Sequence, residues 1–337
     1  MSTVTQPAHQ QSKKTSARIS HFFSIFGLVA LLLLLIATFS ILKPDTFPTG
    51  FTFFSLANNR SIYALAALAV MIPLAANHYD LSIGSLIGIS QILAIGLQAN
   101  QGLPWWLVCV LVLLIGVVVG LINGLLVTVA GIGSFIATLG TGSILLGILQ
   151  WYSGGQQIIG FIDPAFVAIA GRVWSGGPPL SLLYVLLLSV VLWIAFERRP
   201  FGRFLYVIGE NPRMAELNGV STRKYVTMAF VMSGLVGSFA GLVLQAQLQV
   251  GQSTVGPEFM LPAFTGALLG ATSIRPGRTN VGGTLLAISV IAVAVAGLNQ
   301  LGAPFYVEAL FNGWMLILSV GLTLAAARRR ERLATTR

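Results

Sequence analysis

Charged residues are scarce in this chain. Only 8% of its 337 residues are charged while 55% are hydrophobic, and the mean hydropathy is +0.87. Such a composition excludes an ordinary soluble globular protein. Several apolar runs also approach the roughly 20 residues that a helix needs to cross a bilayer. The sequence therefore predicts an all-α protein that crosses a membrane many times.

Cysteine and histidine are also rare, and one nucleotide-binding motif is missing. The single cysteine, Cys109, excludes an intramolecular disulfide, and the scattered His9, His21 and His78 argue against a histidine-built metal site. No lysine follows a glycine, so the Gly-x-x-x-x-Gly-Lys-Ser/Thr phosphate loop is absent. The nine acidic residues lie at or near the ends of apolar runs, which disfavours an ion-coupled transporter. We expect this chain itself to bind no ATP, metal or other cofactor.

Ten apolar runs are candidate membrane spans. Polar or turn-forming clusters such as "NHYD", "ERRPFGR" and "GQSTVGPE" separate them. The second and eighth runs are short, so we expect them to be tilted, broken or covered by neighbouring helices. The first run is longer than a signal-peptide core and is interpreted as a retained helix, with a cleaved signal as the alternative. The runs are Phe22–Leu42, Ser61–Ala76, Leu81–Leu97, Trp105–Ala130, Gly133–Tyr152, Leu180–Phe196, Tyr225–Leu248, Phe259–Ala271, Val281–Leu298 and Tyr306–Ala327.

Basic residues orient these spans. With the N-terminus in the cytoplasm, 16 of the 19 lysines and arginines are cytoplasmic, and only Lys43, Arg60 and Arg172 lie outside. This asymmetry fits the positive-inside rule and explains the net charge of +10 without nucleic acid as a partner. We predict a cytoplasmic tail (residues 1–21), a membrane domain surrounded by lipid (22–327) and a basic cytoplasmic tail (328–337).

Glycine recurs at every fourth position in the fourth run, at Gly116, Gly120 and Gly124. This spacing lets two helices approach closely in a membrane. It favours packing within the chain over a seam between two chains.

The cytoplasmic stretch "VIGENPRMAELNGVSTRKYV" predicts a short helix between the sixth and seventh runs. Asn211 can cap it, Pro212 suits its first position, and Gly219 suits a left-handed residue after its end. A helix of about two turns persists only if packing holds it, so we predict a docking element for another protein. A plain interfacial loop is the alternative. The helix would carry Arg213 and Glu216 on a polar face, with Met214, Ala215 and Leu217 as its small and apolar surface.

The same stretch resembles the cytoplasmic-loop signature of sugar-type ABC transporter permeases, the family of ribose, xylose and related importers. The segments "YDLSIGSLIGIS" (Tyr79–Ser90) and "NGLLVTVAGIGSFIATLGTGSILLGI" (Asn123–Ile148) are similar to two further family elements, so the resemblance spans residues 56–322. The chain departs from the family where Ala271, Pro276 and Thr279 replace expected glycines. The matches around the loop are Tyr206, Gly209, Asn211, Pro212, Ala215, Gly219 and Val220, then Ser233–Gly234 and Ala240–Gly241.

This resemblance implies the permease subunit of an importer in a bacterial inner membrane, a transport subunit and not an enzyme. Two permease chains, identical or sister, would pair, two ATP-binding subunits carrying ATP and Mg would dock beneath, and a periplasmic sugar-binding protein would deliver the solute. The helix after Asn211 would be the coupling helix, with Gly209 and Gly219 letting the backbone turn on either side. The alternatives are a permease for nucleosides, branched-chain amino acids or another small polar solute, an ion-coupled secondary transporter, and a membrane-embedded enzyme.

Side-chain amides near the outer ends of three spans are candidates for the solute pathway. Amides both donate and accept hydrogen bonds, which suits a monosaccharide or polyol, and a tryptophan could stack on a sugar ring. A polar cap and aromatic belt at the membrane surface is the alternative. Asp80 is expected to cap the third span, or else to stand at the mouth of the pathway. The candidate pathway residues are Gln150, Trp151, Gln245, Gln247, Asn299 and Gln300.

Overall fold

A computed structural model describes residues 9–335 and, for most side chains, residues 26–321. The ends of the predicted tails and the side chains of their basic residues lie outside these described parts. Within them all regular elements are helices, and extended backbone pairs only at two isolated bridges, Ile158 with Gly251 and Arg172 with Pro179. The elements are α1 (His9–Leu42), α2 (Gly50–Leu74), α3 (Ile83–Ala99), α4 (Trp105–Thr128), α5 (Ser134–Ser153), α6 (Pro164–Val167), the 3₁₀-helix η1 (Ala168–Ala170), α7 (Leu180–Trp193), the π-helix η2 (Ile194–Arg198), α8 (Pro200–Glu210), α9 (Pro212–Leu217), α10 (Thr222–Leu248), α11 (Pro257–Gly270), α12 (Val281–Gln300) and α13 (Tyr306–Thr335).

Each of the ten predicted spans is a helix in the structure. Five of these helices are long and apolar enough to cross a membrane: α4, α5, α7 with η2, α10 and α12. Shorter apolar stretches lie in α1, α3 and α13. These helices confirm the prediction of an all-α, multi-pass membrane protein.

The second span was predicted to begin at Ser61, but its helix begins earlier in the chain. α2 starts at Gly50, so Arg60, which was placed outside the membrane, lies inside this helix. Polar residues interrupt the apolar run there without ending the helix, because they have partners within the fold. The Arg60 guanidinium donates to Glu308 on α13 at 2.7 Å, and the Asn58 side chain accepts from the Ser181 hydroxyl on α7 at 2.8 Å.

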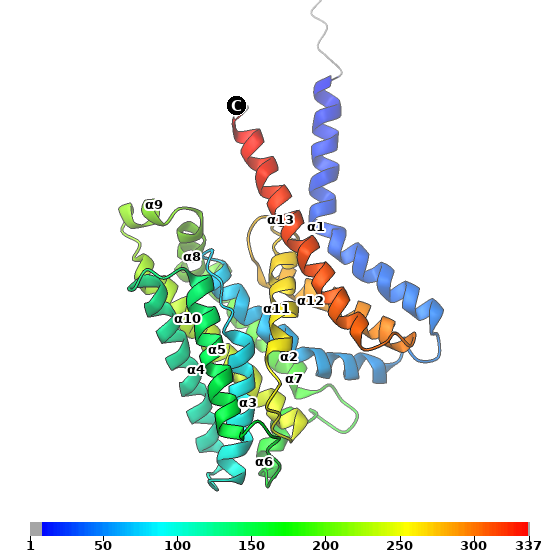
Figure 1. Ribbon diagram of the computed structural model, residues 1–337. Helices are drawn as coiled ribbons and strands as arrows, with labels where there is room; N and C mark the ends of the chain where they lie inside the picture. Colours follow the sequence, from blue (N-terminus) through cyan, green and yellow to red (C-terminus); the bar gives the residue numbers. More distant parts are fainter. Residues whose placement is uncertain (1–8, 336–337) are drawn as a thin grey trace, which may run out of the picture.

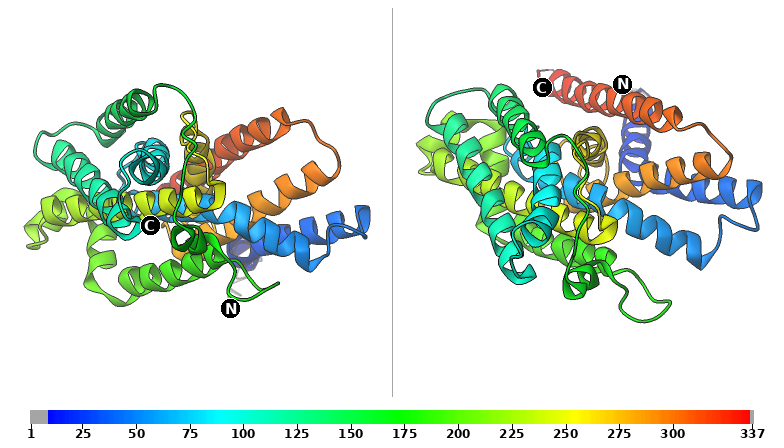
Figure 2. Two further views of the ribbon diagram at one scale, coloured as in Figure 1. Left: turned by 90° about the horizontal axis from the view of Figure 1, so that it is seen from below. Right: turned by 60° about the horizontal axis from the view of Figure 1, so that its bottom comes forward.

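Two groups of helices flank a central pair. In Figure 1, α3, α4, α5 and α10 lie on one side, α1, α12 and α13 on the other, and α2 and α11 between them. Seen from below, α3 is enclosed by α4, α5 and α10 (Figure 2). The beginning of α1 and the end of α13 project from the same end of the molecule as α8 and α9.

Close backbone contact joins α4 to α10, as the glycine spacing predicts. A Cβ on Gly116 would lie 1.6 Å from the Ser238 hydroxyl, and one on Gly120 would lie 2.3 Å from the Phe230 carbonyl oxygen. Both distances are far below van der Waals contact, so only glycine fits at these two positions. The glycine-lined face of α4 therefore packs against α10 of the same chain.

Candidate functional site

The predicted loop helix is present as α9. The Asn211 side chain accepts a hydrogen bond from the Met214 backbone N–H at 3.0 Å, Pro212 occupies the first turn, and Gly219 is left-handed with φ of 79°. Capping and turn chemistry therefore set both ends of a helix that is only six residues long.

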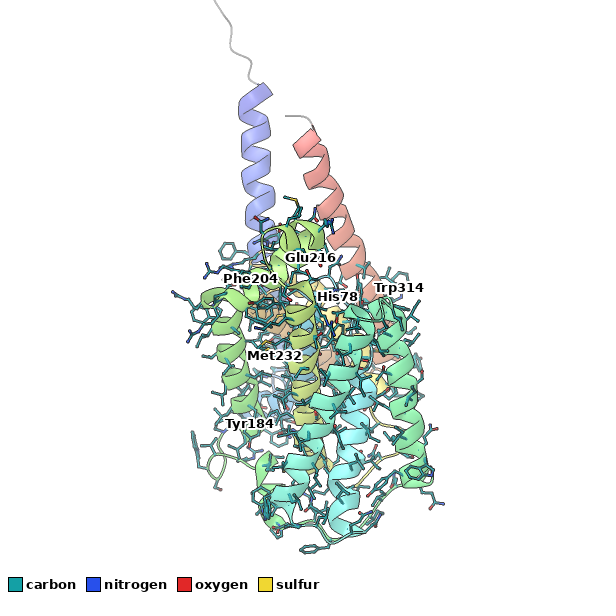
Figure 3. All side chains as sticks on the ribbon, turned by 90° about the vertical axis from the view of Figure 1, so that its left-hand side faces the viewer. His78, Tyr184, Phe204, Glu216, Met232 and Trp314 are labelled. Atoms are coloured by element: carbon teal, nitrogen blue, oxygen red, sulfur yellow. The ribbon has the colours of Figure 1, made fainter. Side chains whose placement is uncertain are left out.

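One side of α9 packs on the protein and the other is open. Ala215 is fully buried, so it holds α9 against the fold and is not available to a partner. Met214 and Leu217 are 53% and 71% exposed, and Arg213 and Glu216 are exposed as well. Figure 3 shows Glu216 at the top of the helical bundle, at the end from which α1 and α13 project. An outward apolar pair flanked by charges is suited to protein docking.

A second loop helix, α8, precedes α9 and was not predicted. Its first residues were interpreted as part of the polar separator "ERRPFGR", yet Gly202, Leu205 and Ile208 form one buried face at helical spacing. Gly209 belongs to this helix, so the expectation that it forms a sharp turn is wrong. A Cβ at Gly209 would lie 2.7 Å from the Ala75 carbonyl oxygen, so glycine is needed there for close approach to the end of α2.

Polar contacts connect α8 to the loop between α11 and α12. The Tyr206 hydroxyl donates to the Thr279 carbonyl oxygen at 2.7 Å, and burial raises the pKa of Tyr206 to about 12, which keeps this donor protonated. The Arg278 guanidinium pairs with Glu210 at 2.6 Å and lies over the Tyr206 ring. Arg275 pairs with Glu197. These contacts, which we call the α8 clamp, connect the α9 region with α11 and α12.

Asp80 is buried in the core and does not cap α3. Ser82 is the N-cap residue of α3, and it makes no capping bond with its own side chain. The Asp80 carboxylate accepts from the Ser82 backbone N–H at 3.2 Å, from the Ser82 hydroxyl at 2.6 Å and from the Ser233 hydroxyl on α10 at 2.9 Å. The Asn123 amide of α4 donates to the Ser82 hydroxyl at 2.9 Å. Asp80 thus joins three helices and, at 1% exposure, is not at a pathway mouth.

The predicted pathway residues do not form one cluster. Gln245 is buried and accepts from the Gln91 amide at 2.7 Å, whereas Gln247 turns to α2 and donates to the Asn58 carbonyl oxygen at 3.2 Å. Residues two apart on a helix point in different directions, which separates this pair. Gln150 and Trp151, at the end of α5, are both exposed.

Asn299 and Gln300 do line a pocket of about 380 Å³ between α2, α12 and α13. The sequence did not identify Arg60 and Glu308 as members of this pocket, although both are charges next to apolar runs. Arg60 and Glu308 form an ion pair in the lining of the pocket. The Arg60 guanidinium lies 5.0 Å from the centre of the Tyr63 ring. We call this the α2–α13 pocket. Its polar lining residues are Thr52, Ser55, Asn59, Arg60, Tyr63, Asn299, Gln300 and Glu308.

No group of three histidine, cysteine or acidic side chains that could hold a metal ion occurs among the described residues. The arrangement that remains is a capped helix with an open apolar face at one end and polar sites inside a helical membrane domain.

Comparison with known proteins decides the family. Residues 52–320 match the family model described as "Branched-chain amino acid transport system / permease component". The chain belongs to this permease family. It is a permease subunit of an import system and not an enzyme. The resemblance inferred from the three sequence motifs is thereby confirmed.

Curated relatives cover nearly the whole chain. The autoinducer 2 import system permease LsrD of Klebsiella pneumoniae is 31% identical over 87% of this chain and 89% of its own length. The ribose import permease RbsC of Haemophilus influenzae is 30% identical over 86% and 90%, respectively. The D-allose transport system permease AlsC of Escherichia coli is 26% identical over 96% and 98%. No solved structure matches the chain.

Proposed function

We propose that this permease carries a monosaccharide or related polyol inward across a bacterial inner membrane, driven by ATP hydrolysis on a separate subunit. Two of the relatives are named for ribose and allose, and this supports a sugar over an amino acid or nucleoside as the solute. The missing phosphate loop supports a separate ATPase.

The observation that carries this proposal is the open face of α9. Met214 and Leu217 are exposed apolar residues at the end where both described chain ends project (Figure 1). If that end is cytoplasmic, as the ten-span topology predicts, α9 faces an ATPase. Two ATP-binding subunits would then contact two permease chains, identical or sister, and a periplasmic sugar-binding protein would dock at the opposite end.

Co-purification tests the docking face. We expect the double variant Met214→Glu/Leu217→Glu to lose about tenfold or more of the ATP-binding subunit recovered with the permease from a mild detergent extract. Phe305→Glu is the matched control, since Phe305 is 93% exposed and lies near the start of α13, away from α9. An unchanged recovery with the double variant would overturn the role of α9.

Uptake assays test the substrate class. Cells that express the permease with its partner subunits should accumulate labelled D-ribose or D-allose, and the accumulation should stop when ATP is depleted. Uptake driven by an ion gradient through the isolated chain would contradict ATP-driven import.

A further inference from the structure

The segment before α11 crosses much of the fold without forming a helix. Residues 249–256 lie between α10 and α11 and run alongside α3. A Cβ on Gly251 would lie 2.7 Å from the Ile95 side chain, and one on Gly84 would lie 2.9 Å from the Gly256 carbonyl oxygen. Ile95 and Gly84 are 11 residues apart on α3, which is about 16 Å of helix. Figure 1 shows this stretch as the thin, non-helical coil that leads into α11.

The segment ends near the middle of the membrane domain. A Cβ on Gly142 of α5 would lie 3.3 Å from the Ser82 Cα, so the start of α3 is level with Gly142. Gly142 lies about 12 Å from one end of α5 and about 16 Å from the other. Gly256, which contacts the first turn of α3, is therefore at mid-depth. The extended residues 249–256 therefore occupy part of the membrane domain's depth before α11, which contains the eighth predicted span, begins.

One edge of this segment is buried and the other is open. Gly251, Ser253 and Val255 are buried, whereas Thr254 and Glu258 are exposed. Gly251 exchanges two backbone hydrogen bonds with Ile158, both 2.9 Å, and the next backbone bond is Phe259 N–H to the Gly256 carbonyl oxygen at 3.0 Å. Between these points no backbone-to-backbone hydrogen bond joins the segment to the rest of the described chain, and the Gln252 backbone N–H donates to the Gln91 side-chain oxygen at 3.4 Å.

Unpaired backbone is strongly unfavourable in lipid. Irregular chain at membrane depth persists where protein buries it or where it lines a water-filled space. The buried edge satisfies the first condition because it packs on α3. The exposed edge carries a hydroxyl and a carboxylate, which points to the second condition.

The exposed edge adjoins the α2–α13 pocket. Phe259, next to Glu258, packs its ring 4.8 Å from the ring of Tyr63, which lines that pocket. Glu258, Arg60 and Glu308 all act electrostatically on Tyr63. Amide and carboxylate groups that suit a polyhydroxylated solute therefore lie both in this pocket and on the exposed edge near Tyr63.

We propose that the exposed edge of residues 252–258 forms a wall of the solute path, where Thr254 and Glu258 face a passing polyhydroxylated molecule. This rests on the proposed import of a sugar or polyol, and it deepens that proposal by naming groups that contact the solute. The separator "GQSTVGPE" then contains residues that contact the solute.

Cysteine labelling tests the proposal. In a Cys109→Ser background, Thr254→Cys should react with a charged, membrane-impermeant methanethiosulfonate roughly tenfold faster than Ile144→Cys, because only a thiol in contact with water forms the reactive thiolate. Ile144 is the matched control, since it is 64% exposed on apolar α5, two residues from Gly142. The assay uses the assembled importer in membranes, and mass spectrometry reads the adduct.

Uptake measured on the same membranes completes the test. Labelling of Thr254→Cys should reduce D-ribose or D-allose uptake about tenfold, and the same sugar in excess should slow the labelling. Uptake by the Ile144→Cys protein should not change. Labelling that leaves uptake intact would overturn the proposal.

Two further outcomes separate this proposal from the proposed function. A Thr254→Cys thiol that does not react would overturn the path wall, and a disulfide between two copies under copper phenanthroline would place it in a permease seam. Failure of the parent protein to take up either sugar would contradict the proposed substrate class, while the labelling contrast between Thr254 and Ile144 would still hold for another solute.

Discussion

Along the seam between α4 and α10 the backbones meet with almost no side chain between them, whereas the α8 clamp works through long polar side chains. At the seam, Gly120 lies directly against the Phe230 carbonyl, deep among apolar residues. In the clamp, Tyr206 of α8 reaches the Thr279 carbonyl in a loop, and Arg278 of that loop reaches back to Glu210 on α8. Apolar side chains gain little by leaving lipid, so close packing stabilises the interior, while hydrogen bonds and charges act near water.

The largest expected effect tests the seam. Gly120→Leu should destabilise the protein by about 3 kcal/mol or more, because its Cβ alone would overlap backbone that cannot move aside. The thermal midpoint of the purified permease and its yield as a monodisperse peak should both fall. Gly140→Leu on α5 is the control, since a Cβ there meets nothing within 4 Å. Equal losses in the two variants would break the distinction between the seam and an open face.

A smaller loss of stability is expected at Asp80, whose carboxylate accepts a hydrogen bond from Ser233 on the seam helix α10. Asp80→Ala removes the acceptor for Ser82 and Ser233 and leaves their hydroxyls buried, at a cost of about 2–3 kcal/mol. Ser233→Ala removes one of these bonds and should cost only about 1 kcal/mol. Denaturant unfolding followed by tryptophan fluorescence compares the two. If Asp80→Ala leaves the free energy of unfolding unchanged, the buried carboxylate does not stabilise the helix packing.

The smallest effect on stability is expected in the clamp. Tyr206→Phe deletes one hydrogen bond to Thr279 and should cost about 1 kcal/mol. Because the folded pKa of Tyr206 is raised, its contribution should stay constant at all pH values below about 10, the unfolded value, and fall away above it. Tyr225→Phe is the control, since Tyr225 makes ring contacts without a hydrogen bond from its hydroxyl among the described residues. The ratio of ATP hydrolysed to sugar imported should rise in Tyr206→Phe alone.

Local chemistry made α9 predictable. An asparagine cap, a proline and a left-handed glycine act within a few residues, so the sequence alone defines the two ends of this helix. The polar start of α2 and the polar face of α8 were missed because each is stabilised by residues far away in the chain. Arg60 contacts Glu308, and Tyr206 contacts Thr279.

The candidate pathway shows the same limit. Asn299 and Gln300, predicted as pathway residues, line a pocket, yet Arg60 and Glu308 join them only when α2 and α13 come together. Gln245 and Gln247 were chosen for the same amide chemistry, but they point toward different helices. Side-chain type indicates what a residue can bind, and helix packing determines where it faces.

The sequence by itself determined that this is a multi-pass helical permease with a capped loop helix, because hydropathy, capping and family motifs are local properties of the chain. Only the tertiary structure decided that extended chain precedes α11 along α3, that Asp80 joins three helices, and that polar groups line one pocket. Each of these depends on which distant groups satisfy a polar atom inside a membrane, and that requirement is met by the fold as a whole.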